Sequence, residues 1–184
     1  MITKLNDLGQ PVIQLTQDDY KNCYVIMGLI QLEVENRNAK TSYEANPLLN
    51  EATTFCGVLG EQAVANYFGC PNVYKPYDPK AHDVLGYEVR ATYHENGCLL
   101  THDPDDKNYG DKPGRYIFVT INQKTLTATI RGYSTLTRCN ERADNYQTSW
   151  RYPCFAMPQN QLWPIDMLPA TDELSAFRQV KAVA

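Results

Sequence analysis

The 184-residue sequence has no long apolar run and no paired-cysteine motif. No segment approaches the roughly 20 consecutive apolar residues that span a bilayer, and the opening MITKLNDLGQ lacks the apolar centre of a secretory signal. The six cysteines are scattered, without a CxxC pair or the Cys/His spacing of a zinc site. We therefore expect a cytoplasmic protein with reduced cysteines and no membrane partner.

A basic excess, which is typical of nucleic-acid binding, is also missing, since the net charge is -4. The charges are distributed unevenly, however. Residues 1–61 hold four basic and eight acidic side chains, whereas residues 107–151 hold eight basic and three acidic ones. The later part could face a polyanion, and a solvated basic surface is the alternative. The nucleic-acid-binding candidates are Arg115, Arg131, Arg138 and Arg142.

The first half of the chain predicts two helices. Thr16 to Asp19 resembles a capping box, and apolar residues then recur every three or four positions, which predicts a helix over 17–37. Residues 38–46 are polar and predict a loop. A second helix is expected from Pro47, which suits a first helical turn, to Phe68, because Gly69 suits the position after a helix end.

From residue 70 the pattern changes to short alternating runs that predict strands. Expected strands are 72–75, 83 or 87–93, 98–102, 115–122, 126–133 and 152–156, with a turn-rich loop at 103–114. Only a tight hairpin fits between 121 and 127, so 115–133 should be an antiparallel pair. Prolines interrupt the tail from residue 158, before a short helix at 171–180 capped by Thr171.

These elements predict one α+β domain over 1–184, because the length suits a single core. It comprises N-terminal helices within 17–69, a sheet core at 70–157 and a proline-rich tail with a short helix at 158–184. The expected fold is a mixed, largely antiparallel central sheet flanked by helices.

The segment from Asp83 to Thr92 places charge in an apolar strand. With a side-chain period of two, Glu88, Arg90 and Thr92 share one face, and the residues between them share the other. One face of this strand is therefore suited to chemistry and the other to packing. The alternative is a partly exposed ion pair between Glu88 and Arg90 on an edge strand.

Two glycines stand inside the second predicted helix. Gly57 and Gly60 each cost roughly 1 kcal/mol relative to alanine there, so we expect a neighbour that requires their small size. Glu61 follows directly, and close packing would give it access to the strand. An exposed helix carboxylate is the alternative.

These carboxylates predict a site for Mg²⁺. Magnesium prefers oxygen ligands and keeps several waters, so two or three carboxylates from separate elements suffice. The candidate ligands are Asp83, Glu88 and Glu61, and Arg90 would lie beside a phosphate. A metal ion so held can support phosphodiester hydrolysis.

Three short segments of the sequence resemble the motifs of the PD-(D/E)XK, or restriction-endonuclease-like, nuclease superfamily. They are GVLGE at 57–61, DVLG at 83–86 and EVRAT at 88–92. They look most like small phage-encoded members, and the tail at 157–168 is similar to the closing segment of those proteins. The resemblance covers roughly residues 55–168 through a short and degenerate motif.

The resemblance implies a restriction-endonuclease-like core with two N-terminal helices and metal-dependent cleavage of DNA. It places metal ligands at Asp83 and Glu88, the helical glutamate at Glu61 and the third motif position at Arg90. Thr92 would be an auxiliary polar residue, as would His82, which adjoins Asp83. The residues do not distinguish DNA from RNA, and a homodimer stays open.

Three departures from the motif matter. Ala81 and His82 replace the proline before the aspartate, and the short spacing from Asp83 to Glu88 requires a tight turn at Gly86. Arg90 replaces the motif lysine, and an arginine cannot act as a general base. It can still orient water or stabilise a charged transition state.

Three hypotheses follow from these residues. The first is a phage-encoded, Mg²⁺- or Mn²⁺-dependent deoxyribonuclease. The second is a nuclease-like fold that no longer cuts and instead binds nucleic acid or a host protein. The third is a purely structural or assembly component.

Overall fold

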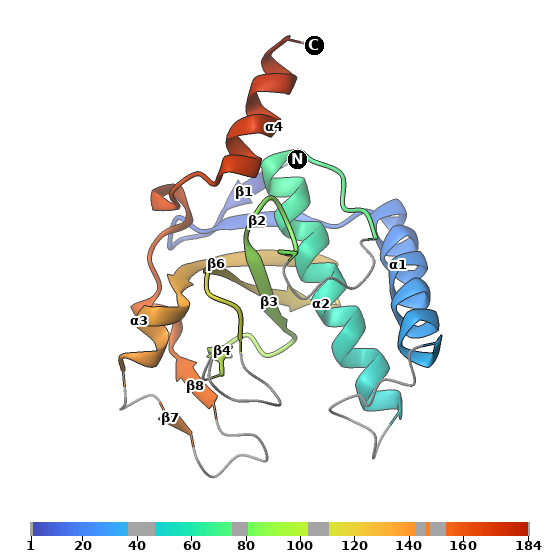
Figure 1. Ribbon diagram of the computed structural model, residues 1–184, viewed down its shortest axis with the longest axis horizontal. Helices are drawn as coiled ribbons and strands as arrows, with labels where there is room; N and C mark the ends of the chain where they lie inside the picture. Colours follow the sequence, from blue (N-terminus) through green and yellow to red (C-terminus); the bar gives the residue numbers. More distant parts are fainter. Residues whose placement is uncertain are drawn as a thin grey trace.

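The computed structural model describes residues 2–36, 47–74, 81–102, 111–142, 146–147 and 154–183. The helices within these ranges are α1 (Gln17–Asn36), α2 (Pro47–Phe68), α3 (Leu136–Asn140) and α4 (Asp172–Val183). They pack with two sheets (Figure 1). In the described part of the chain, no helix combines the length and the apolar character needed to cross a membrane.

The larger sheet has five strands in the order β1-β2-β6-β5-β3. Its strands are β1 (Ile2–Leu5), β2 (Pro11–Gln14), β3 (Glu88–Thr92), β5 (Arg115–Asn122) and β6 (Thr127–Thr135). Every pairing in it is antiparallel except the parallel contact of β3 with β5, in which Glu88 is level with Tyr116. The predicted α+β fold with a largely antiparallel sheet is therefore confirmed, and its likeness to the restriction-endonuclease core stays a prediction.

The smaller sheet has the order β4-β8-β7. Its strands are β4 (Leu99–Thr101), β7 (Tyr146–Gln147) and β8 (Cys154–Met157). Its contacts with β5 show how the core divides: Ile117 belongs to the core formed with α1 and α2, while Phe118 belongs to a second core with Leu99, Leu136 and Met157. Strand β5 is thus buried on both faces, which explains its nearly unbroken apolar run.

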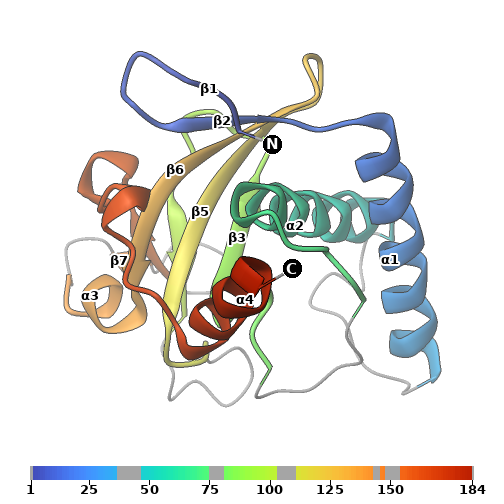
Figure 2. The same cartoon turned by 90° about the horizontal axis from the view of Figure 1, so that it is seen from above.

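Helix α2 packs very closely on β3, and α1 lies on its outer side (Figure 2). A Cβ atom built on Gly60 would lie 2.5 Å from the Ala91 Cβ and 3.4 Å from a Val89 methyl carbon. At Gly57 a Cβ would meet nothing within 4 Å. The predicted need for a small residue is confirmed at Gly60 and wrong at Gly57.

The tail is held against β6 by a two-residue backbone bridge. The Tyr133 and Trp163 amides each donate to the other residue's carbonyl at 2.9 Å, and the Tyr133 hydroxyl donates to the Met167 carbonyl. The short 3-10 helix η2 (Gln159–Gln161) precedes this bridge, and a second one, η3 (Ile165–Met167), lies between the bridge and α4. The Thr171 hydroxyl accepts the Leu174 amide at 3.1 Å, which confirms Thr171 as the cap of the predicted terminal helix.

The structure differs from the predicted elements in several places. Residues 72–74 form no strand, and β1, β2, α3 and β7 were not expected. The strands β1, β2 and β7 have two to four residues, which is too short to show a period of two in the sequence. They form because their backbones pair with a neighbouring strand. The predictions for residues 37, 38–46, 75, 103–110 and 152–153 lie outside the described residues.

The two glycines of α2 provide a matched test of this packing. We expect Gly60→Ala to lower the free energy of unfolding by about 1–3 kcal/mol, because the added methyl group meets Ala91. Gly57→Ala should raise it by up to about 1 kcal/mol, since alanine is the better helix former and the space is open. Urea denaturation of both variants measures the difference. Equal effects at the two positions would contradict the close contact.

Candidate functional site

A tight turn brings the two predicted ligands of β3 together. Val84 and Tyr87 form an antiparallel bridge, and between them Leu85 and Gly86 both have positive φ, of 47° and 80°. Positive φ at both central residues is typical of a type I′ hairpin turn. Asp83 directly precedes this bridge and Glu88 directly follows it, so the turn brings the two carboxylates close enough for the charge of Glu88 to act on Asp83. The predicted tight turn at Gly86 is confirmed.

The start of α4 is bonded to the same turn. The Thr171 hydroxyl donates to the Leu85 carbonyl at 2.5 Å, and a Cβ atom on Gly86 would lie 3.0 Å from the Thr171 Cβ. The turn therefore requires glycine both for its φ and for the space that Thr171 occupies. This contact ties the position of Asp83 to the C-terminal part of the chain.

Glu88 is a buried carboxylate, with 2% of the residue exposed. Its Oε1 lies 2.8 Å from His82 Nδ1 and 2.9 Å from Lys112 Nζ. Lys112 also donates to the Ala81 carbonyl. A charge so deeply buried needs such partners, because its removal from water is expensive. The alternative of a partly exposed pair with Arg90 is wrong, since Glu88 is buried and its lysine partner is Lys112.

The sequence analysis did not single out Lys112. It follows Asp111 in the segment that we predicted to be a turn-rich loop, and nothing in the local pattern links it to Glu88. The link comes from the parallel pairing of β3 with β5, which sets Tyr116 level with Glu88. The Tyr116 hydroxyl donates to the Lys112 carbonyl at 2.6 Å and so holds Lys112 near the start of β5. Sheet pairing therefore places the end of this loop beside β3.

Asp83 faces the same polar cluster. Its Oδ2 accepts the Val89 amide at 2.8 Å. Burial raises the pKa of Asp83, and the negative charge of Glu88 raises it further, against the opposing effects of the Val89 amide, Arg90 and Lys112. The two carboxylates thus share a site, and the charge of Glu88 disfavours ionisation of Asp83.

Arg90 is held by a second carboxylate that the sequence did not single out. One Nη2 to Oδ1 contact of 2.6 Å joins it to Asp111, and its guanidinium carbon lies 5.2 Å from the centre of the Tyr116 ring. Asp111 also accepts the His102 amide at 2.8 Å. Burial acts to raise the pKa of Asp111, but the bonds from His102 and the charge of Arg90 outweigh it, and the pKa lies below its usual value.

The remaining candidates on and near β3 lie outside these contacts. Gly60 of α2 packs on Ala91, which is on the face of β3 opposite to the Glu88 side chain. Burial raises the pKa of Cys23 in α1, and the charges of Asp19 and then Glu61 raise it further. The charge of Glu61 therefore acts on a residue of the neighbouring helix α1. Its role as a metal ligand stays a prediction. Thr92 accepts the amide of the following turn, at His94.

Arg131 and Arg138, which are among the four arginines proposed for nucleic-acid binding, contact side chains within the fold. The Arg138 guanidinium lies 4.2 Å from the centre of the Trp163 ring. Arg131 donates to the Thr120 hydroxyl at 2.7 Å and to the Gln10 side chain at 3.2 Å. Arg115 begins β5 and Arg142 follows α3. Contact of the four with nucleic acid stays a prediction.

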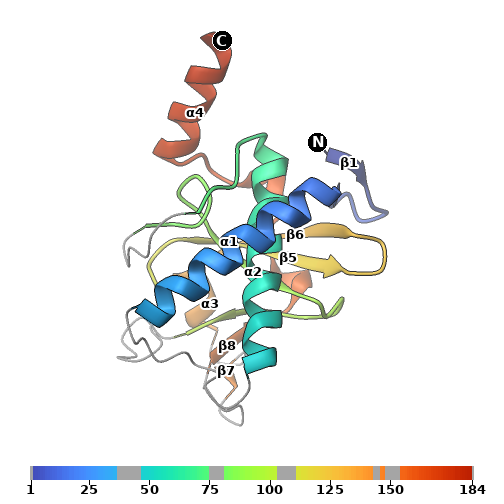
Figure 3. The same ribbon diagram turned by 90° about the vertical axis from the view of Figure 1, so that its right-hand side faces the viewer.

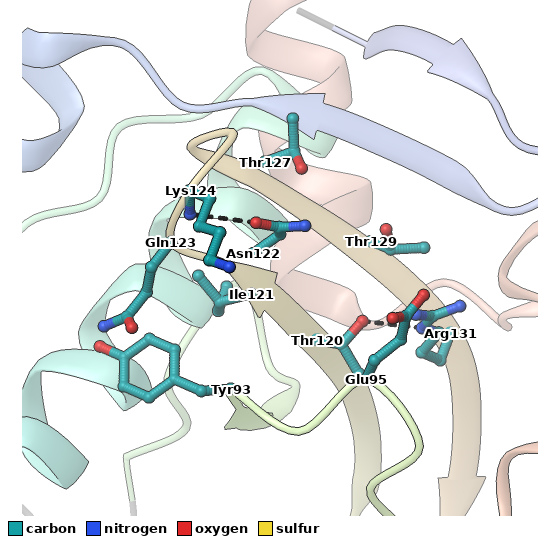
Figure 4. A pocket seen from close by; sticks show the side chains of 10 residues that line it. All are labelled: Tyr93, Glu95, Thr120, Ile121, Asn122, Gln123, Lys124, Thr127, Thr129 and Arg131. Carbon is teal, nitrogen blue, oxygen red and sulfur yellow. Dashed lines mark hydrogen bonds between the residues drawn. The ribbon is translucent and has the colours of Figure 1, made fainter.

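Arg131 also lines a polar pocket of about 370 Å³ at the far end of β5 and β6 (Figure 4). The Tyr93 and Gln123 side chains point toward each other there, and Glu95 lies beside Arg131. Burial, followed by the charge of Cys56, raises the pKa of Tyr93 to about 12, so this phenol stays protonated at neutral pH. The pocket therefore offers hydroxyl, amide and guanidinium donors to a ligand.

The donors near the turn suit a hard divalent cation. Within the described ranges, no group of three or more His, Cys, Asp or Glu side chains is arranged to hold a metal ion. Asp83 and Glu88 offer two carboxylate groups at the turn. Two are enough, because Mg²⁺ binds through one or two carboxylates while it keeps waters or substrate oxygens. The pair fits Mg²⁺ or Mn²⁺ in its chemistry.

No protein-family model, curated protein or solved structure matches this chain. Its function is therefore argued from the cluster around Glu88 and from the resemblance of the motif.

The raised pKa of Asp83 predicts a stability that depends on pH. A carboxyl whose pKa is higher in the folded state stabilises the fold below its ordinary pKa, and this contribution is lost as pH rises through the folded value. At neutral pH, ionised Asp83 therefore destabilises the protein, and Asp83→Asn should melt at a higher temperature than the wild type. The advantage should shrink toward pH 4 in thermal melts with EDTA.

The matched control for this melt is Asp7→Asn, because Asp7 is exposed in the turn between β1 and β2. It should melt close to the wild type. A loss of stability in Asp83→Asn at neutral pH would contradict the repulsion between Asp83 and Glu88.

Proposed function

We propose that the protein is a nuclease dependent on Mg²⁺ or Mn²⁺ that hydrolyses phosphodiester bonds of DNA at the cluster of Asp83, Glu88, Arg90 and Lys112. The observation that carries the proposal is the buried Glu88 carboxylate, which faces Asp83 and lies 2.9 Å from the Lys112 amine. The motif resemblance and the basic excess of residues 107–151 support the same function.

Phosphodiester hydrolysis requires a water nucleophile and positive charge near the phosphoryl oxygens. When bound, Mg²⁺ or Mn²⁺ supplies positive charge and makes a bound water more acidic. Asp83 and Glu88 would hold the ion. Burial, followed by the charge of Glu88, raises the pKa of Asp83, and a cation between the two carboxylates would relieve their repulsion.

Lys112 supplies what the sequence motif lacks. An arginine keeps its proton, so Arg90 cannot take one from water, and it leaves the motif without the compact ammonium of a lysine. The Lys112 ammonium bonds to Glu88 and one third of its side chain is exposed, so it can reach a substrate from within the cluster. We assign Lys112 to orienting the attacking water and stabilising negative charge on the phosphoryl group.

Arg90 has the complementary role of stabilising charge. Asp111 and the Tyr116 ring hold its guanidinium, and 35% of the side chain is exposed. A guanidinium that is fixed before substrate binds stabilises a charged transition state without reorganising. His82, at 2.8 Å from Glu88, orients that carboxylate.

The substrate and setting are inferred from the resemblance. The phage-encoded proteins that share the motif favour DNA in a host cytoplasm, with RNA as the alternative substrate. Arg115, Arg131, Arg138 and Arg142 are the proposed contacts with the backbone, because phosphate binding depends on cationic side chains.

A second function has its own support in the structure. Both contacts of Glu88 fall on Oε1 and include the Lys112 cation, so the carboxylate is already compensated without a metal ion. Such a network would suit a nuclease-like protein that binds nucleic acid or a host protein and does not cut. The two functions differ in whether Mg²⁺ or Mn²⁺ binds and whether cleavage follows.

Cleavage assays on a panel of DNA and RNA substrates, with Mg²⁺, Mn²⁺ or EDTA, separate these functions. We expect metal-dependent cleavage of DNA by the wild type and a loss of about 100-fold or more in Glu88→Gln and in Lys112→Met, because each variant removes a group from the reacting centre. The matched controls are Glu173→Gln and Lys4→Met, which change exposed residues of α4 and β1 and should cleave normally.

Circular dichroism and thermal melts of each variant show whether a loss of cleavage reflects unfolding. Folded variants that cleave like the wild type would contradict this site. A wild type that binds DNA, shows no metal-dependent rise in melting temperature and cleaves nothing would favour the second function.

A further inference from the structure

Helix α1 carries an exposed apolar stripe. Val25, Leu29 and Leu32 are 61%, 38% and 56% exposed, and their spacing of four and three residues places them on one side of the helix. The opposite side carries the buried Cys23 and Ile26, which pack into the core. Figure 3 shows α1 on the outside of the molecule, so the stripe is a surface feature.

Gly28 lies within this stripe. A Cβ atom at this position would meet nothing within 4 Å, so the packing of the single chain does not require glycine there. Glycine is also one of the poorest helix formers, so its place near the centre of a 20-residue helix, at a half-buried position, is unusual. A glycine in this place is explained if another backbone approaches it closely.

A flanking aromatic residue extends the stripe. Tyr24 stacks on Phe55 of α2 with ring centres 4.3 Å apart, and 57% of Tyr24 is still exposed. The stacking fixes the ring against the surface, so it presents a rigid apolar edge next to Val25. Rigid aromatic groups lose little side-chain entropy on binding, which favours their use in contacts between proteins.

We infer that this face of α1 binds the same face of a second copy of the chain, with the two α1 helices antiparallel. The stripe is nearly symmetric about Gly28 and Leu29. Antiparallel pairing therefore sets Val25 of each copy opposite Leu32 of the other and brings the helices closest at Gly28. A contact of this kind is self-complementary, as a two-fold dimer requires.

The charges at the ends of the stripe favour the second copy and the antiparallel direction. Lys21 precedes the stripe and Glu35 follows it, and both are exposed. Antiparallel helices place each Lys21 near the partner copy's glutamate, whereas parallel helices would set like charges together. Within one copy, Lys21 pairs with Asp18 at 3.0 Å. Both side chains are exposed, so this contact is weak and Lys21 can exchange it for another partner.

Light scattering and sedimentation of the full chain across a range of concentrations test the dimer. The wild type should approach twice the monomer mass of 20.9 kDa. A helix pair is smaller than the standard interface of about 1,600 Å², so we expect dissociation in the micromolar range or above. Leu32→Glu should raise the dissociation constant at least about tenfold, because it buries a charge.

Three further variants separate the packing, the direction and the folding of α1. Gly28→Gln should weaken the dimer while leaving the monomer at least as stable, since glutamine is the better helix former. Lys21→Glu should weaken the dimer, and adding Glu35→Lys should restore it through the reversed pair. The matched control is Val180→Glu in α4, which is 71% exposed and should leave the mass unchanged.

A wild type that stays a monomer at all concentrations would overturn the dimer, and a partner of another kind would then be the occupant of this face. A dimer unchanged by Leu32→Glu and Gly28→Gln would place its interface elsewhere. Nuclease activity need not change in any of these variants, so this result is separate from that of the cleavage assay.

Discussion

The burial of the Glu88 carboxylate is the constraint on which the rest of the structure depends. An ionised group that is 2% exposed must be compensated within the fold, and Lys112 and His82 do so through one oxygen. Both partners come from segments outside β3. The buried charge of Glu88 is therefore compensated only when β3 pairs with β5 and the short segment before Asp83 is in place.

The two faces of β3 perform different tasks in consequence. One face carries Val89 and Ala91, and the second of these approaches Gly60 so closely that α2 has no room for a side chain there. The other face carries Glu88 and Arg90, each with a partner of opposite charge. Close packing on one side keeps the strand in place, and a fixed strand keeps the charged groups at defined separations, as a catalytic site requires.

The arrangement also explains why the carboxylates are not optimised for stability. Burial raises the pKa of Asp83, and the charge of Glu88 raises it further. Sites that bind a cation are commonly built in this way, because the group that relieves the repulsion is the ligand itself. Arg90 and Asp111 differ from this pair, since each neutralises the other without a ligand.

Part of this structure could be predicted because its causes are local. The bounds of α2 follow from Pro47, Gly69 and the apolar pattern between them, and the turn at Gly86 follows from the short spacing of Asp83 and Glu88. The local pattern gave a wrong prediction for residues 72–74, where it predicts a strand and the structure has none. It also failed to predict β1 and β2, whose strand character comes from pairing.

Local patterns in the sequence predict which residues share a face of β3, the positions of α1, α2 and α4, and which carboxylates stand beside the turn, because periodicity, caps and turn residues act over a few positions. Only the tertiary structure decided which cation meets which carboxylate. Lys112 and Asp111 reach Glu88 and Arg90 through the parallel pairing of two strands that are distant in sequence. Electrostatic partners are set by distance in space, and no local pattern in the chain encodes that distance.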